Sequence, residues 1–549
     1  MNRLVVAAVS IVLVNVSAVP AGSSLFLGKS ADAWRKDLSD SDASVRRSAA
    51  FALGRMGEEA RGAVPHLVRR LQEDTDAGVR DMAASAIGDI ARSIKYGNAT
   101  LWERSGGMLV QILKGDPSER VRRSAAYALG AFGAQAAGAA ENLIKALSDE
   151  NASVRQNAAW ALGQIGDAAG EAVPKLCECL RDKDTLVRRD AAGALGSLGK
   201  AGEKAGRPLL LLVQSEPDTV VKKTALESLA HIAGPEQAEY AKDFDPLLED
   251  KDPEIRLPAA LVLARIGGEE SANALPVLRA ALKHAEPHIQ ELATAALANL
   301  GPLAKPAMHD LAETLTDAKN TVVVRRNAAL AISHIGPEAK PVVPALVKGL
   351  ERGQPLEVRQ FAAEALAQMK YPANEEGVPA LLKAINEDSD PYVRQKCVWA
   401  LFNVNPADKF RELGADKVLA KLLDLRGDNT ALLRYDAARK LANVLREEAP
   451  DKTTDVLLEM LTNLQLKVYN RMDAQVQGAG TEATVGRANV RANLGGDARY
   501  MAVQALSWLG EKAAKRADVV AALRKAAKDE DAKLKKTAKE ALMDLGIKE

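Results

Sequence analysis

A short pattern that returns about every 34 residues constrains the fold of this chain more than any other feature. The stretch "NASVRQNAAWALGQIG", Asn151 to Gly166, places a basic residue, Arg155, before the small pair Ala158 and Ala159. Most of the intervals between successive copies are 33 to 35 residues long, and each copy carries a basic or amide residue at the same position. These repeat positions are Arg46, Arg80, Arg122, Arg155, Arg188, Lys222, Arg256, Gln290, Arg325, Arg359, Arg394, Arg434, Arg499 and Lys535. A period of this length indicates an array of similar units that stack on one another.

Each copy carries the signals of two helices. The first helix is short and apolar, as in residues 173–180, and has a proline in its first turn, where proline is tolerated. The second helix begins after a capping residue four positions before the repeat position, and it ends at a glycine such as Gly166. The capping residues are Asp42, Asp76, Ser118, Asn151, Asp184, Asp218, Asp252, Thr321, Asp390, Thr430 and Asp531. The chain is therefore predicted to be all-α and built from helical hairpins.

Composition supports close helix packing and argues against one class of partner. Hydrophobic residues make up 47% of the chain and aromatic residues only 4%, so the interior is built from small and aliphatic side chains that let helices approach closely. Lys plus Arg number 74 and Asp plus Glu number 73. Because nucleic-acid binders usually carry a clear basic excess, no nucleic-acid partner is expected.

Three copies carry a resemblance to a known family: "DENASVRQNAAWALGQIG", "DKDTLVRRDAAGALGSLG" and "DKDPEIRLPAALVLARIG". They resemble HEAT repeats, particularly the bacterial form related to the HEAT-like repeats of phycobilisome bilin lyases. The resemblance covers Ala31 to Gly546. It implies a right-handed α-solenoid (superhelix) of about fourteen HEAT-like helical hairpins. Tetratricopeptide repeats share the period but lack the Val-Arg-x-x-Ala-Ala pattern.

The resemblance also implies a structural role for the repeated arginine. In HEAT families such arginines form a ladder with aspartates of the turns between adjacent repeats, and here an aspartate stands six residues before the repeat position in many copies. A planar guanidinium can bond a carboxylate and backbone carbonyls together. The ladder residues expected here are Asp149, Arg155, Asp182, Arg188, Asp250, Arg256, Asp388 and Arg394, and the other aspartates of the column are Asp40, Asp74, Asp116, Asp428 and Asp529.

A binding surface is expected one, five and nine residues after the repeat position. These positions share one face of the second helix, and the ninth is mostly polar, which indicates exposure. In HEAT solenoids this face lines the concave surface. The binding candidates are Arg47, Phe51, Arg123, Tyr127, Gln156, Trp160, Arg326, Gln395 and Trp399. The alternative is that the aromatic side chains only pack over small residues of the next repeat.

The first residues resemble a targeting segment. Leu4 to Val19 is mostly apolar, and small residues offer cleavage sites after Ala18 or Ala21. A cleaved signal peptide predicts export to the periplasm or outside the cell, with no membrane span left in the mature chain. The predicted domains are a signal peptide at 1–21, a HEAT-repeat solenoid at 31–475, a glycine-rich and flexible inserted loop at 476–497, and C-terminal HEAT-like repeats with a cap at 498–546. Residues 93–107, with Trp102, form a weaker candidate loop.

The sequence contains no catalytic signature, so no enzyme activity, cofactor or metal is expected. HEAT-like di-iron hydroxylases bind iron through His-Glu dipeptides, and none of the six histidines is followed by glutamate. His284 and His288 are four apart but have no evident third ligand. The three cysteines have neither disulfide nor zinc spacing. The expected role is to bind or scaffold a protein or peptide. The alternatives are an enzyme or chaperone-like accessory of the bilin-lyase kind and, more weakly, polyanion binding.

Overall fold

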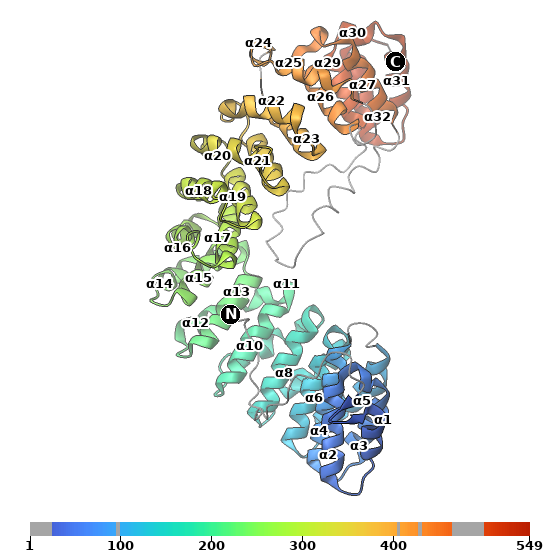
Figure 1. Ribbon diagram of the computed structural model, residues 1–549, viewed down its shortest axis with the longest axis vertical. Coiled ribbons are helices and arrows are strands. Elements are labelled where there is room, and N and C mark those ends of the chain that lie inside the picture. The colour runs from blue at the N-terminus through green and yellow to red at the C-terminus, as the bar shows by residue number, and fades with distance from the viewer. Residues whose placement is uncertain are drawn as a thin grey trace. The chain divides into compact units, whose positions relative to one another are not determined.

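The structure is a computed structural model that describes residues 25–94, 99–402, 404, 407–425, 431–463 and 499–548 of the 549-residue chain (Figure 1). Within these residues the chain is an all-α solenoid that begins with a short antiparallel hairpin. In this hairpin β1 (Leu25–Phe26) pairs with β2 (Lys29–Ser30). The predicted signal peptide at 1–21 and the predicted loop at 476–497 lie outside the described residues. The chain divides into two compact units at Tyr240.

The first unit is a stack of helical hairpins in which first and second helices alternate. Its first helices are α1 (Ala31–Asp37), α3 (Val64–Glu73), α5 (Ala99–Gly115), α7 (Ala140–Ala146), α9 (Val173–Cys179) and α12 (Gly206–Ser215). Its second helices are α2 (Ala43–Met56), α4 (Ala77–Ser93), α6 (Glu119–Ala131), α8 (Ala152–Ile165), α10 (Thr185–Ser197) and α13 (Thr219–Ile232). Short segments join them: η1 (Gly57–Ala63), η2 (Gly133–Ala139), η3 (Gly166–Ala172), α11 (Gly199–Gly202) and η4 (Glu203–Ala205). After α13, η5 (Pro235–Phe244) leads into the second unit.

The second unit repeats the same alternation. Its first helices are α14 (Asp245–Leu248), α16 (Leu275–Ala281), α18 (Met308–Thr316), α20 (Val343–Gly349), α22 (Val378–Glu387), α25 (Ala415–Leu422), α27 (Asp451–Thr462) and α31 (Ala517–Ala526). Its second helices are α15 (Pro253–Ile266), α17 (Pro287–Leu300), α19 (Val322–Ile335), α21 (Leu356–Met369), α23 (Pro391–Ala400), α26 (Ala431–Leu445), α29 (Arg499–Trp508) and α32 (Ala532–Asp544). The joining segments are η6 (Glu269–Ala274), η7 (Gly301–Ala307), η8 (Gly336–Val342), η9 (Glu375–Gly377), α24 (Ala407–Glu412), η11 (Arg446–Glu448) and α30 (Glu511–Ala514).

All fourteen repeat positions lie in second helices, as the sequence period predicts. The predicted caps are confirmed at most helix starts: the Asn151 side chain accepts from the backbone N–H of Ser153, and Asp184 accepts from two N–H groups. Ser118 occupies the cap position without bonding through its side chain, and Thr430 lies outside the described residues. Gly166 ends α8 with a φ of 73°, a conformation that L side chains rarely adopt.

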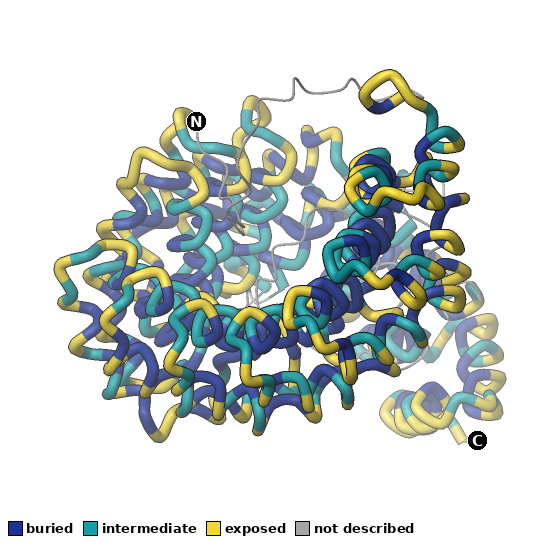
Figure 2. The backbone as a smooth tube through the Cα atoms, turned by 90° about the horizontal axis from the view of Figure 1, so that it is seen from below, coloured by how far each residue is buried: buried dark blue, intermediate teal, exposed yellow. Residues whose placement is uncertain are grey.

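Small residues let the second helices stack closely. Ala158, Ala159 and Leu162 of α8 are fully buried. A Cβ added at Gly130 of α6 would lie 2.7 Å from the Ala161 Cα atom of α8, so the two backbones are nearly in contact. Buried positions run along the helices, and exposed positions gather at the turns (Figure 2). The core is therefore the alanine- and leucine-rich layer within and between hairpins.

One predicted insertion differs from the structure. Residues 99–107, expected to belong to a loop, form the first half of α5, and Trp102 lies edge-on against Phe132 at 5.3 Å between ring centroids. The apolar face of this stretch has a partner in the same hairpin, which is why it is helical.

Candidate functional site

The repeated arginine joins its own turn to the next repeat. Arg155 donates from Nε and Nη2 to the two Asp182 carboxylate oxygens, at 2.7 and 2.8 Å. Its Nη1 donates to the backbone carbonyls of Asp149 and Glu150, at 2.9 and 3.0 Å. One guanidinium therefore holds a carboxylate of the following repeat and two carbonyls of its own turn.

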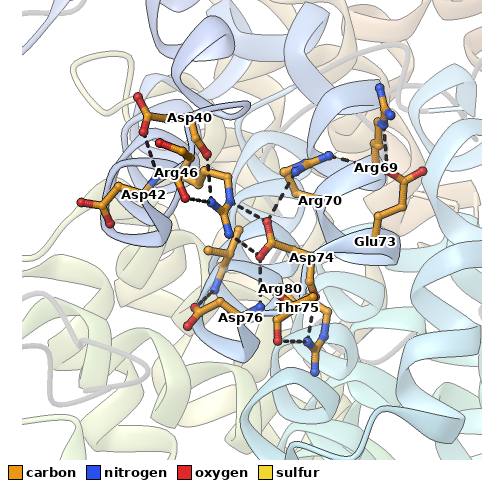
Figure 3. Close-up of polar contacts among 12 residues, drawn as sticks. Asp40, Asp42, Arg46, Arg69, Arg70, Glu73, Asp74, Thr75, Asp76 and Arg80 are labelled. Atoms are coloured by element: carbon orange, nitrogen blue, oxygen red, sulfur yellow. Dashed lines mark hydrogen bonds and ion pairs between the residues drawn. The ribbon is translucent and has the colours of Figure 1, made fainter.

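The same arrangement recurs in both units. Figure 3 shows Arg46 between the Asp40 turn and Asp74, with Arg80 bonding the carbonyls of the next turn. Further ion pairs of the repeat positions include Arg80–Asp116, Arg122–Asp149, Arg188–Glu216, Arg359–Asp388, Arg434–Glu459 and Arg499–Asp529. Because the arginines and carboxylates of this column bond one another, they belong to the stacked repeats and not to a free binding site.

The ladder shifts the titration of its members. Burial raises the pKa of the Asp182 carboxyl, but hydrogen bonds from Arg155 and from the Asp184 backbone outweigh that effect and hold the pKa below its usual value. The hydrogen bonds with Asp182 raise the pKa of Arg155. Both groups are therefore charged at neutral pH, and each stabilises the charge of the other.

The ladder departs from the expectation in the second unit. Arg256 donates to the carbonyls of Asp250 and Lys251, at 2.6 and 2.9 Å. It forms no ion pair with another described residue, because His284 stands where the next aspartate would lie. Arg394 donates to the Ile385 carbonyl at 2.6 Å, and its expected partner Asp428 lies outside the described residues.

The face predicted from positions one, five and nine is open along the second helices. In α8, Gln156 and Trp160 are half-buried and Gln164 is exposed. The ninth-position residues that the structure describes are all exposed or half-buried: Arg55, Asp89, Ala131, Gln164, Ser197, His231, Arg265, Asn299, His334, Gln368, Asn443, Trp508 and Asp544. The predicted exposure of the ninth position is thus confirmed. Asn403, the ninth residue after Arg394, lies outside the described residues.

Tyr127 and Trp160 form a stacked aromatic pair on this face. Their ring centroids are 5.5 Å apart and their planes differ by 18°. Each ring also packs on the preceding repeat: an added Cβ would lie 2.9 Å from Tyr127 at Gly88 and 2.5 Å from Trp160 at Gly130. The packing alternative expected contact with the next repeat, whereas these rings lie on the preceding one. Both rings remain half-exposed, so they pack and also present a surface.

Polar contacts border the aromatic pair. Arg123 lies 3.4 Å from Asp81, and its side chain is 40% exposed. Gln156 donates to Asp190 at 2.9 Å, and Arg189 bonds the other oxygen of the same carboxylate at 2.7 Å. These contacts pre-order the side chains of the face.

The Tyr127 hydroxyl links the aromatic pair to charged neighbours. It donates to Asp89 at 2.7 Å and accepts from Arg92 at 3.2 Å. Burial and the hydrogen bond with Asp89 raise its pKa. Tyr127 is therefore neutral at physiological pH and fixed in orientation.

The second-unit candidates Gln395 and Trp399 differ from the expectation of a free face. Both donate to the same oxygen of Asp436, at 2.7 and 2.8 Å, and Gln395 is only 9% exposed. The Lys396 ammonium lies 4.4 Å from the centroid of the Trp399 ring. Because Asp436 of α26 bonds both groups, Gln395 is a buried contact between repeats and does not lie on an open surface.

The remaining candidates lie apart from these clusters. Phe51 is 43% exposed and meets Phe26 of the N-terminal hairpin edge-on at 6.4 Å. Arg47 is exposed and lies against Gly78 of α4. Arg326 stacks over the Phe361 ring at 5.7 Å. The structure therefore brings Arg123, Tyr127, Gln156 and Trp160 together and leaves the other candidates separate.

A family comparison agrees with this geometry. The model of HEAT repeats matches residues 31–96, 108–196, 140–230, 208–298, 244–333 and 343–442, which together span more than half of the chain. This chain belongs to the HEAT-repeat family. No curated protein matches it. Among solved structures, this chain is similar to an engineered protein whose crystal structure comes from the Northeast Structural Genomics Consortium. It is 23% identical, with 75% of this chain and 98% of that chain covered and a TM-score of 0.41.

Some residues that shape the face of this HEAT-repeat protein were not found from the sequence. Three carboxylates accept hydrogen bonds from the polar side chains of the face: Asp81, Asp190 and Asp436. They stand one or two residues after a repeat position, where most copies have no carboxylate. An aspartate two residues after the repeated arginine, as Asp190 after Arg188, is the sequence feature that could have indicated such a contact. Its partner on the neighbouring helix is visible only after folding.

A buried lysine is another feature that the repeat pattern did not reveal. Lys440 of α26 is fully buried and donates to the carbonyls of Phe402 and Val404, at 2.7 and 3.1 Å. Burial lowers its pKa to about 7. Lys440 closes the end of the preceding hairpin, where backbone carbonyls need a donor.

The described residues also bear on metal binding and membrane insertion. No group of three or more potential metal ligands occurs among those residues, and His284 and His288 are both exposed there. None of the described helices is both long and apolar enough to cross a membrane. The described residues thus supply neither a metal cluster nor a membrane-spanning helix.

Proposed function

We propose that this HEAT-repeat chain is an exported protein that binds a protein or peptide partner on the face formed by positions one, five and nine of its second helices. It carries out no catalysis of its own in this proposal. The observation that carries it is the half-exposed stack of Tyr127 and Trp160 bordered by Arg123 and Gln156. Aromatic and arginine side chains that are fixed in advance are typical of the residues that dominate protein interfaces.

The packing of the helices supports this choice of face. Within the first unit, successive second helices contact one another along their length, as α4 does with α6 and α6 with α8. The first helices make fewer contacts with their equivalents. Closer packing on the second-helix side favours curvature toward that side, and helical-repeat proteins use such surfaces for extended partners.

The structure directs the choice of variants for a binding test. Trp160→Ala would remove packing on Gly130 as well as the exposed surface, so loss of binding would be ambiguous. Arg123→Ala combined with Gln164→Ala removes two part-exposed side chains of the face and leaves the stack in place. The matched control is Glu178→Ala combined with Arg181→Ala, which changes two exposed residues, one in the last turn of α9 and one in the turn that follows it.

The test measures partner recovery from the exported fraction with each tagged protein. At least a tenfold loss with the face variant and none with the control is expected. Equal recovery with both would refute binding at this face. A chromophore on the purified protein would instead support an accessory of the bilin-lyase kind, and steep loss of binding with salt would support polyanion binding.

Export rests on the segment 1–21 and has its own test. The sequence places small residues before the possible cleavage sites after Ala18 and Ala21. N-terminal sequencing of the protein from the exported fraction should begin at Val19 or Gly22. An intact N-terminus at Met1, in the cytoplasmic fraction, would refute export.

A further inference from the structure

A cavity of about 670 Å³ opens on the second-helix face of the last repeats, within the second unit. Gln504 and Trp508 of α29 and Glu540 and Asp544 of α32 line it. These four residues are the fifth- and ninth-position residues of two consecutive repeats, so the cavity belongs to the face described above. Glu447 and Glu448 of η11 close one side. Its volume lies in the range of ordinary ligand pockets.

The cavity has an excess of negative charge. Four carboxylates line it together with a single cation, Arg446. Glu448 pairs with Arg411, outside the lining. Glu447 accepts the backbone N–H of Glu511 at 2.8 Å, which orients the carboxylate without neutralising it.

The α32 carboxylates are the least neutralised. Glu540 lies 3.8 Å from Lys536, at the long end of ion-pair distances. Asp544 is exposed, and its carboxylate makes no hydrogen bond or ion pair with another described residue. The wall of the cavity formed by α32 is therefore free to accept a cation.

Trp508 differs from the other tryptophans of the chain. Trp34, Trp102, Trp160 and Trp399 each contact a ring or a cation. Trp508 is half-buried, and no described residue provides it with a ring, cation or hydrogen-bond partner. An open indole beside carboxylates suits a guanidinium or ammonium group, because the cation can lie over the ring and bond the carboxylates at once.

We infer that this cavity binds a basic segment of the protein partner, with an arginine or lysine side chain over Trp508 and against Glu540 and Asp544. The inference rests on the proposed function, since it names the chemistry of a partner on the same face. Charge complementarity carries the choice of occupant: the lining is acidic, whereas the first-unit face carries Arg47, Arg123 and Arg189. A basic segment would therefore bind the C-terminal end of the face selectively.

The test uses the full chain and a defined probe, a fluorescein-labelled peptide of alternating arginine and alanine. Binding is followed by fluorescence anisotropy. Glu540→Gln with Asp544→Asn removes the two charges at nearly constant shape, and at least a tenfold rise in Kd is expected. The control is Glu351→Gln with Glu387→Gln, two exposed acidic residues of the same unit, with a Kd within twofold of the parent. Thermal melts of both variants should match that of the parent, because all four side chains are exposed.

Two outcomes would overturn the inference. One is equal affinity of the cavity variant and the control, which would mean non-specific attraction. The other is absence of probe binding to the parent chain, which would mean that the acidic lining and Trp508 do not hold a basic side chain. Arg123→Ala with Gln164→Ala should leave probe affinity unchanged. A failure of the first-unit proposal is therefore distinguishable from a failure at the cavity.

Discussion

Replacing Arg155 by alanine tests the structural role of the ladder directly. The Arg155 side chain is 9% exposed and that of Asp182 is 12% exposed, so the pair is largely buried. The variant loses two bonds to the carboxylate and two to the carbonyls of Asp149 and Glu150. Asp182 then keeps only the backbone N–H of Asp184, at 2.9 Å.

Breaking a buried ion pair from one side costs about 3–5 kcal/mol, because the remaining charge stays buried without its partner. We expect Arg155→Ala to lower the free energy of unfolding of its unit by this amount in urea titrations followed by circular dichroism. Arg181→Ala, which removes an exposed arginine from the turn between α9 and α10 of the next repeat, should change the free energy of unfolding by less than about 0.5 kcal/mol. Hydrogen exchange should show the loss in the repeats around α8 and α10, since repeat arrays couple mainly through neighbours.

The pH dependence gives a second check. The folded-state pKa of Asp182 is lowered, so the stability from this pair is fully present above the unfolded pKa near 4 and is lost as pH falls through the folded value. The difference in the free energy of unfolding between the parent and Arg155→Ala should therefore become smaller below about pH 4. Equal urea midpoints for Arg155→Ala and Arg181→Ala at pH 7 would refute the structural role of the arginine.

Three further predictions concern other parts of the two units. Lys440 has a folded pKa of about 7 against 10.5 unfolded, so the folded state binds fewer protons between these values. Between these two pKa values the free energy of unfolding should rise by about 1.4 kcal/mol per pH unit. Urea titrations of the parent between about pH 7 and 8.5 should show this slope, and those of Lys440→Met should not. Gly130→Ala should destabilise by about 1–3 kcal/mol, because the new Cβ would lie 2.7 Å from a backbone atom of the next repeat. Gly107→Ala, with open space around it in α5, should stabilise by about 0.5–1 kcal/mol, and similar thermal melts for the two would contradict the close packing. Asp184→Ala should lower the free energy of unfolding by about 1 kcal/mol, whereas Ser118→Ala should lower it little because the Ser118 side chain makes no cap bond. Equal decreases in melting temperature for the two variants would contradict this assignment.

Local chemistry made much of the fold predictable. The capping residues, the glycines at helix ends and the alanine pairs act within one hairpin, so a single copy of the pattern contains all of them. The arginine of the ladder was predictable for a related reason: Arg155 reaches a carboxylate 27 residues away that stands at the same place in the next copy. The position of the bonding partner in the next repeat can therefore be read from the repeat pattern itself.

The candidate site was less predictable, because its contacts depend on which side chain faces which across two helices. Gln395 and Gln156 occupy the same position of the repeat, yet Gln395 is buried against Asp436 while Gln156 stays half-exposed beside Asp190. Position alone predicts the face, and the neighbouring repeat decides the burial.

The sequence by itself determined the hairpin, its caps and the exposed face, because these follow from helix periodicity and from capping bonds that recur in most copies. The resemblance to HEAT repeats added the ladder residues. Only the tertiary structure decided that Trp160 packs back on Gly130. It also decided that Glu447, Trp508 and Asp544 share one cavity. These contacts join residues of different repeats that do not recur along the chain, and their distances exist only after the helices have stacked.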